Sequence, residues 1–257
     1  GTSFEVPVPA GVDAGDFLIA QIGYSAAGTI TPPTGWNLID VTTNPSKPIM
    51  QGLYWRAATA DEPTHYSFTL ESVQSDTAAG AIAAYSGIDL TNPIDAVGTQ
   101  SNGATTEIVA PSITPSTPDT AVISFVTVRD DGTVTPPAGM TEQWDVNSAA
   151  GVGVVAETLL AAADEVFTTA GDTGTRVATA EASDGSVAHL VALTPAVELF
   201  VDPIVGHTFV QWEDATALSG VPQGQYGGSM EWITNQVTGA NTFWNAGHTG
   251  AGVDVAL

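Results

Sequence analysis

The sequence predicts an all-β fold: a jelly-roll-like β-sandwich of about twelve strands with an internal duplication, followed by an irregular, short-helical C-terminal tail. Short apolar or alternating runs recur at intervals of roughly ten residues between turn-forming residues, a spacing typical of all-β proteins. No stretch before residue 196 keeps a sustained helical period. Residues 29–36 (TITPPTGW) also return as 133–140 (TVTPPAGM), an offset of 104 residues from 29 to 133. This self-similarity indicates two halves that fold alike.

The repeated segment has the composition of a corner between strands. Its Pro-Pro pair can neither donate a ladder hydrogen bond nor continue a strand, and its glycine permits a turn. A large apolar residue follows each turn, Trp36 in the first copy and Met140 in the second. The exchange of Trp for Met fits a shared buried position better than a binding site, so we expect a structural corner here.

The first half reads as six strands. Phe17 to Tyr24 (FLIAQIGY) is apolar on both faces, as expected of a covered central strand. The other expected strands are 4–8, 36–41, 50–56, 65–70 and 78–85. Residues 89–103 (DLTNPIDAVGTQSNG) are expected to form a polar connection.

The second half repeats this order. Its expected strands are 106–111, 121–129, 140–146, 152–161, 175–182 and 187–193. Two arrangements fit the duplication: two tandem sandwiches, or one pseudo-symmetric sandwich in which each sheet takes strands from both halves. The short connection favours the single sandwich, which we place at residues 1–195 with pseudo-repeats 1–98 and 99–195.

The character of the chain changes after Pro195. Residues 196–228 lose the alternation and collect Gly, Pro and Gln, as expected of a linker. Ser229 can cap a short helix, 240–246 can form another, and 252–257 (GVDVAL) reads as the opening of a buried strand.

Charge and composition exclude several classes of function. The 257 residues include 4 basic and 28 acidic side chains, a net charge of −24. Such a field repels nucleic acid and anionic membrane surfaces, and no apolar run is long enough for a transmembrane helix. We therefore expect no nucleic-acid partner and no membrane insertion. The absence of cysteine excludes disulfides and thiolate sites, and the low Lys with high Ala, Thr, Gly and Asp favours an extracellular protein, secreted or on a cell or virion surface.

Few residues qualify as site candidates. Asp130 and Asp131 are adjacent in a turn and are weak candidate Ca²⁺ ligands, because solvated turn acids on an acidic surface explain them better. No other cofactor is expected. No spacing groups a Ser or Cys nucleophile with a base and an acid, so we expect no enzyme activity from this chain. His189 lies in an apolar strand and is expected to be a satisfied core or sheet-face residue.

Aromatic residues on neighbouring strands offer a candidate glycan platform. Tyr54, Trp55 and Tyr66 could stack sugar rings, but alternation places Tyr54 and Trp55 on opposite faces of their strand. At least one of the two is therefore expected in a core.

The tail carries a resemblance to a known family. Residues 247–253 (GHTGAGV), with the short helix expected before them and the strand after them, resemble the entry into the catalytic domain of subtilisin-like serine proteases. In that family the strand ends at the catalytic Asp, in an Ile-Asp-Thr/Ser-Gly context. Asp254 lies inside the strand and does not match it. The resemblance implies that 229–257 is the truncated start of such a protease domain and brings no catalytic residue with it.

The repeat region resembles a second group of proteins. Residues 15–20 (GDFLIA), both TPPxG turns and 92–96 (NPIDA) are similar to β-sandwich modules of secreted multidomain bacterial proteins and of phage tail or fibre proteins. This resemblance implies an accessory or structural role. We therefore expect a non-catalytic extracellular module for spacing, adhesion or assembly, N-terminal to a subtilisin-like protease domain. The alternatives are a self-assembling fibre, filament or virion surface protein, and a glycan-binding module. The expected partners are copies of the chain, the protease domain, or a glycan or other cell-surface ligand.

Overall fold

The described part of the chain is built from antiparallel β-strands. The computed structural model describes residues 2–25, 28–71, 78–130, 132–148, 158–196, 200–201 and 208–209, and every regular element among them is a strand. This confirms the predicted all-β fold. The helices predicted in the tail and most of the predicted linker lie outside the described residues. Among the described residues, no helix is long and apolar enough to cross a membrane.

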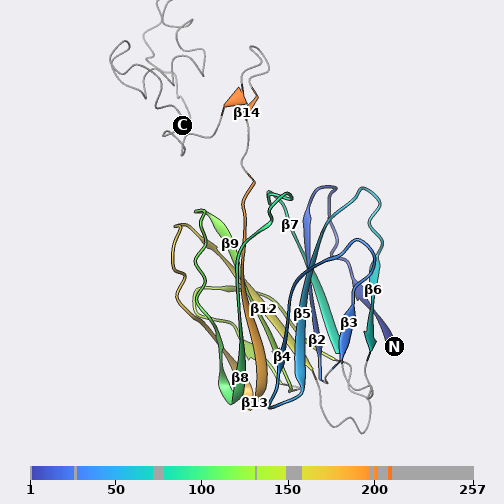
Figure 1. Ribbon diagram of the computed structural model, residues 1–257, viewed down its shortest axis with the longest axis vertical. Coiled ribbons are helices and arrows are strands. Elements are labelled where there is room, and N and C mark those ends of the chain that lie inside the picture. The colour runs from blue at the N-terminus through green and yellow to red at the C-terminus, as the bar shows by residue number, and fades with distance from the viewer. Residues whose placement is uncertain are drawn as a thin grey trace, which may run out of the picture. The chain divides into compact units, whose positions relative to one another are not determined.

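The chain divides into two compact units, residues 1–196 and 197–257. Within the second unit, β14 (Phe200–Val201) pairs with β15 (Thr208–Phe209). The first unit holds the remaining strands (Figure 1). All three buried cores of the described residues also belong to it.

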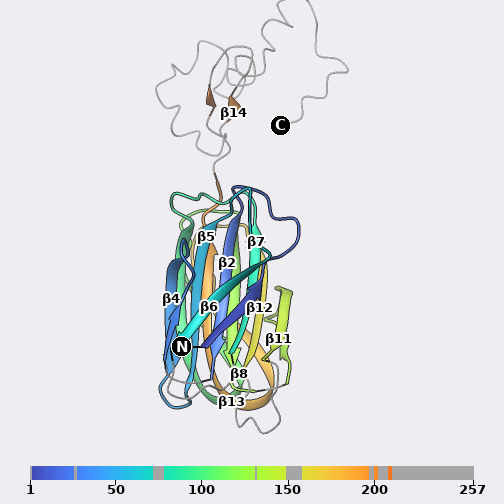
Figure 2. The same cartoon turned by 90° about the vertical axis from the view of Figure 1, so that its right-hand side faces the viewer.

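The first half of this unit is a sandwich of two sheets. One sheet has the order β4-β5-β2-β7 and the other has the order β1-β6-β3. Figure 2 shows the four-stranded sheet face-on, with β1 and β6 crossing in front of it. The strands are β1 (Thr2–Pro7), β2 (Phe17–Tyr24), β3 (Thr29–Thr31), β4 (Asn37–Asn44), β5 (Ile49–Ala57), β6 (His65–Glu71) and β7 (Ala78–Tyr85). The core between the two sheets is aromatic, with Trp36, Tyr54, Tyr66 and Phe68 in contact.

The second half makes its two layers from one sheet of six strands. The strands are β8 (Ile94–Ala110), β9 (Thr120–Val128), β10 (Val134–Thr135), β11 (Thr141–Asn147), β12 (Leu159–Phe167) and β13 (Arg176–Leu193). Residues 186–193 of β13 pair with β9, whereas 179–180 pair with β10. Register irregularities between Thr179 and Ser186 separate these two parts, and such bulges bend a strand. The core that β13 helps to enclose is rich in alanine.

The two copies of the Pro-Pro turn have the same conformation. Gly35 and Gly139 have φ of +90° and +87°, a region that favours glycine. After each glycine, the backbone N–H of the large apolar residue donates to the first residue of the turn: Trp36 to Pro33 O at 3.3 Å, Met140 to Pro137 O at 3.1 Å. Trp36 is 7% exposed and Met140 is 8% exposed. The prediction of a shared buried position is therefore confirmed.

The arrangement of the two halves differs from the one we favoured. Strands of both halves were expected to share each sheet, but β1 to β7 form two sheets of their own and β8 to β13 form a third. The reason is that the two halves meet face to face: their large sheets stack and enclose a third core instead of exchanging strands.

Two local predictions also need correction. The expected polar connection 89–103 contains the beginning of β8, whose polar side chains suit a strand that pairs only with β13 among the described strands. The expected strands 175–182 and 187–193 form the single strand β13, because pairing with β8 continues along both parts.

Candidate functional site

The most distinctive site in the described residues lies between the two large sheets. An apolar cluster fills most of this interface, with Phe17, Ile19 and Leu53 from the first half. The second half contributes Ile123, Phe125, Ala162, Val191 and Leu193. Buried polar side chains lie beside this cluster, and a buried polar group is destabilising unless it is hydrogen-bonded.

The polar residues come from strands of both halves. Gln21 on β2, Gln51 on β5 and His189 on β13 are completely buried. Asp40 on β4 keeps 35% of its side chain exposed, so one end of the group reaches solvent. Trp144 on β11 lies at the other end.

These five side chains form a continuous hydrogen-bond chain that crosses the interface. Trp144 Nε1 donates to Gln21 Oε1 at 2.8 Å, and Gln21 Nε2 donates to Gln51 Oε1 at 2.8 Å. Gln51 Nε2 lies 2.6 Å from His189 Nδ1, and His189 Nε2 lies 3.0 Å from Asp40 Oδ2.

The chemistry of the two ends fixes the direction of every bond. An indole N–H can only donate and an ionised carboxylate can only accept. Trp144 therefore requires the oxygen of Gln21, which turns the Gln21 amide N–H groups toward the oxygen of Gln51. The amide N–H of Gln51 must then donate to His189 Nδ1, which leaves the N–H of His189 on Nε2, facing Asp40.

Further bonds to the second half reinforce this direction. Gln21 Nε2 also donates to Val126 O at 2.8 Å, and Gln51 Nε2 also donates to Phe125 O at 3.4 Å. The Thr127 hydroxyl donates to Gln51 Oε1. Flipping either amide would place its oxygen against these carbonyl oxygens, so the orientation of both glutamines is set by the backbone of β9 as well as by Trp144.

The Asp40–His189 pair has the form of an acid–base dyad but lacks an accessible base. His189 is buried and satisfied, which confirms its prediction as a core residue. Its Nδ1 accepts from the Gln51 amide and so cannot take a proton from a substrate. The hydrogen bond from His189 lowers the pKa of the Asp40 carboxyl, while partial burial opposes the shift.

The three residues of the predicted glycan platform face inward. Tyr54 and Tyr66 are 2% and 6% exposed in the aromatic core of the first half, and burial raises the pKa of Tyr54 to about 12. Trp55 is partly buried and stacks on Phe17 with ring centroids 5.5 Å apart. The strand alternation predicted for Tyr54 and Trp55 is thus observed, and these rings serve two different cores.

The predicted calcium ligands are not brought together with others in the described residues. Asp130 is partly buried after β9, and Asp131 lies outside the described residues. Within the described part of the chain, no group of three or more His, Asp or Glu side chains could hold a metal ion.

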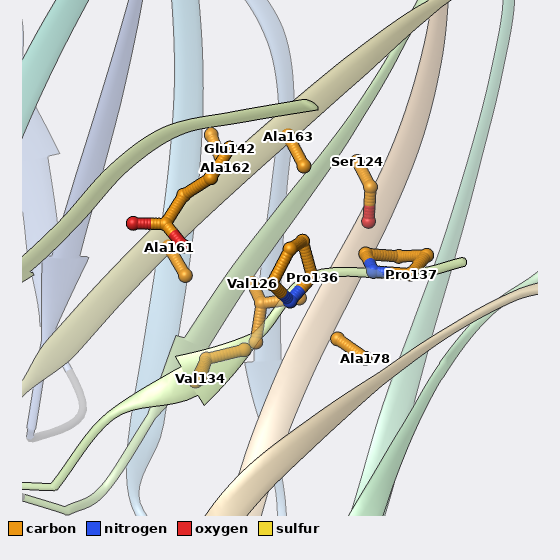
Figure 3. A pocket seen from close by; sticks show the side chains of 10 residues that line it. All are labelled: Ser124, Val126, Val134, Pro136, Pro137, Glu142, Ala161, Ala162, Ala163 and Ala178. Atoms are coloured by element: carbon orange, nitrogen blue, oxygen red, sulfur yellow. The ribbon is translucent and has the colours of Figure 1, made fainter. Parts of the chain in front are cut away.

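A small hollow lies under the second Pro-Pro turn, in the core of the second half. Figure 3 shows Pro136 and Pro137 beside Ser124 and Ala178. Its free volume is about 10 Å³, room for about one water molecule. Ser124 is 2% exposed and its hydroxyl has no hydrogen-bond partner in the structure, so a water would suit it. The hollow is too small for an organic ligand.

The sequence contains one signal for the polar chain. Gln21 interrupts the apolar run 17–24, and Gln51 stands in a strand that is otherwise apolar and aromatic. An interior polar residue in a central strand indicates a buried partner. The sequence does not identify that partner, because Val126 lies 105 positions from Gln21 and His189 lies 138 positions from Gln51 along the chain.

Comparison of the chain with known protein families, with curated proteins and with solved structures found no match.

Asp40→Asn tests the charged end of the hydrogen-bond chain. The pKa of Asp40 is lowered in the folded state, so its charge stabilises the fold above its ordinary pKa of 3.8, and this contribution is lost as pH falls through the folded value. Because the carboxyl is about one-third exposed, we expect D40N to lower the free energy of unfolding by about 1 kcal/mol at pH 7. Urea denaturation between pH 7 and 3 should show this difference shrinking toward zero. Asp61→Asn, in an exposed turn, is the matched control, and a D40N deficit that is constant with pH would contradict the assignment.

Proposed function

We propose that residues 1–196 are a non-catalytic structural module, a stiff spacer or assembly unit of an extracellular protein. The observation that carries this proposal is the interface between the halves. It joins two sandwiches through an apolar cluster and a hydrogen-bond chain in which every buried polar member has a partner. A hinge between two domains would need an interface that can open, and opening this one would expose its apolar cluster to water and break the hydrogen bonds of Gln21 and Gln51 to the second half.

The interior chemistry also supports a structural role. The dyad that could have served as a base is committed to holding β4, β5 and β13 together. The predicted aromatic platform is used for packing in two cores. The polar and aromatic side chains that most resemble functional residues thus have identified structural tasks.

The tail bears on the position of the module in a larger protein. The resemblance of 229–257 to the entry of a subtilisin-like catalytic domain supports a module that precedes a protease. The strong negative charge and the low lysine content support the extracellular location.

Pulling on the two ends of the chain tests whether residues 1–196 act as one mechanical body. In single-molecule force spectroscopy we expect one rupture that releases roughly 60 nm of chain, because the two halves share a core. Two separate ruptures of roughly 30 nm each would show that the halves yield independently and would contradict the spacer proposal.

Sequencing the parent gene beyond the codon for Leu257 tests the protease association. The expected continuation is an Ile-Asp-Thr/Ser-Gly segment, followed later by the histidine and serine motifs of the family. An open reading frame without these motifs would refute the association and leave the spacer proposal standing.

A second candidate function, self-assembly, is favoured by the edge strands. β4 and β8 are edge strands of the two stacked sheets and lie side by side, with Thr99 Oγ1 donating to Thr42 Oγ1 at 2.7 Å. Leu38, Val41 and Val97 on these strands are 58%, 38% and 43% exposed. Exposed apolar edges are templates for pairing with another chain.

Negative-stain electron microscopy of the purified chain tests this second candidate. If the β4 and β8 edges mediate assembly, the wild-type chain forms filaments and the double variant L38K/V97K does not. Val166→Lys is the control, since Val166 is 68% exposed but lies on β12, between two other strands of its sheet. Dispersed wild-type particles, or filaments equally lost in V166K, would count against edge-mediated assembly.

A further inference from the structure

The contacts between the two halves are reciprocal. The repeat relates β2 to β9, β4 to β11, β5 to β12, and β7 to the last part of β13. Across the interface β4 contacts β13 while β11 contacts β7, and β5 contacts β9 while β12 contacts β2. This is the pattern of a two-fold homodimer interface, in which each element meets the counterpart of its partner.

Two corresponding residues meet near the centre of this pattern. Gly23 and Thr127 are 104 positions apart, the spacing of the repeat. A Cβ atom added at Gly23 would lie 2.8 Å from Thr127 Cγ2 and only 2.2 Å from Leu160 Cδ2. A larger residue at position 23 would therefore force Thr127 or Leu160 of the second half to move.

The corresponding contact on the other side of the interface is polar, whereas the contact of Gly23 with Leu160 is apolar. Gly23 is paired with Gln51 in its own sheet, and Thr127 is paired with Leu160 in its sheet, so Gln51 and Leu160 correspond. Where the first half offers Gly23, the second offers the apolar Leu160. Where the second half offers the Thr127 hydroxyl, the first offers the Gln51 amide.

The ends of the hydrogen-bond chain break the symmetry in the same way. Asp40 and Trp144 correspond, since they pair with Leu53 and Ala162 in equivalent registers. His189 corresponds to Ala81, since each pairs with the equivalent position of the central strand, Phe125 or Gln21. An acceptor-only carboxylate in one half thus stands where a donor-only indole stands in the other.

We propose that these two sheet faces are a heterologous recognition pair: each accepts the other half and rejects a second copy of itself. A pairing of two first halves would place Gln51 against Gly23 and Asp40 against Ala81, so the Gln51 N–H groups would lose the His189 acceptor and the partly buried Asp40 carboxylate would lose its imidazole donor. A pairing of two second halves would place Leu160 against Thr127, where even a Cβ atom is too close. Only the mixed pairing satisfies both sets of side chains.

This proposal goes beyond the spacer role, because it specifies how copies of the chain can and cannot associate through this surface. An exchange between two molecules can occur only as first half with second half, so that a swapped assembly keeps the mixed interface. If exchange uncovers the interface face of one half, the partner that covers it again is thus the complementary half of another copy of this chain.

Cleavage of the connection in the otherwise complete chain tests the proposal. A recognition sequence for a specific protease is inserted between Thr91 and Asn92, which are exposed in the turn before β8. After cleavage, isotopically light and heavy preparations are mixed and taken through partial denaturation in urea and back. Native mass spectrometry should find complexes with one copy of each fragment, including mixed light–heavy pairs. Complexes with two copies of the same fragment, or fully separated fragments, would overturn the proposal.

A measurement on the uncut chain tests the fit that excludes self-pairing. Gly23→Ala should increase the equilibrium constant for unfolding by about tenfold or more, because the new methyl group meets Leu160. In a Leu160→Ala background, Gly23→Ala should increase the equilibrium constant for unfolding by a clearly smaller factor. Gly103→Ala is the matched control, since a Cβ atom there meets nothing within 4 Å. The steric part of the proposal would be overturned if G23A changed the equilibrium constant for unfolding no more than G103A does. It would also be overturned if the effect of G23A on that constant were the same with and without L160A.

Discussion

The structure of residues 1–196 depends on one constraint: amides buried between two sheets must have hydrogen-bond partners. Gln21 and Gln51 belong to the central strands of the first half, yet their N–H groups donate to carbonyl oxygens of β9 and to His189 in the second half. The first half does not supply these acceptors itself. The two sandwiches are therefore coupled by hydrogen bonds across the interface as well as by the apolar cluster beside them.

The duplication explains why the two halves have the same architecture. The differences in sequence between the halves explain why they hold together. The repeated Pro-Pro turn gives both halves the same corner, with a left-handed glycine and a buried large residue. The cores behind the two corners then differ: Tyr54 and Phe68 in the first half have Ala163 and Ala178 as their counterparts in the second. The faces that meet between the halves differ even more, and there the differences are complementary. A duplicated fold has thereby become a single body with two unlike parts.

The polar residues of the interior hold the two halves together. Asp40 and His189 have the geometry of a catalytic pair, but the second nitrogen of the imidazole is occupied by Gln51. The aromatic residues that could stack a sugar lie in cores. A stiff module that positions another domain needs side chains that hold its parts together. The interior polar and aromatic residues do this, which agrees with the proposed spacer role.

The sequence by itself determined most of the strands, the corners and the duplication, because these follow from local alternation, from proline and glycine, and from self-similarity. β2 and β7 begin and end where the pattern predicted, and Trp36 and Met140 occupy the shared position expected of them. Only the tertiary structure decided how the halves meet, that β8 is a strand, and which partners the buried glutamines find. These outcomes depend on contacts between residues more than a hundred positions apart, such as Gly23 with Leu160 and Gln51 with His189, and no local pattern encodes them.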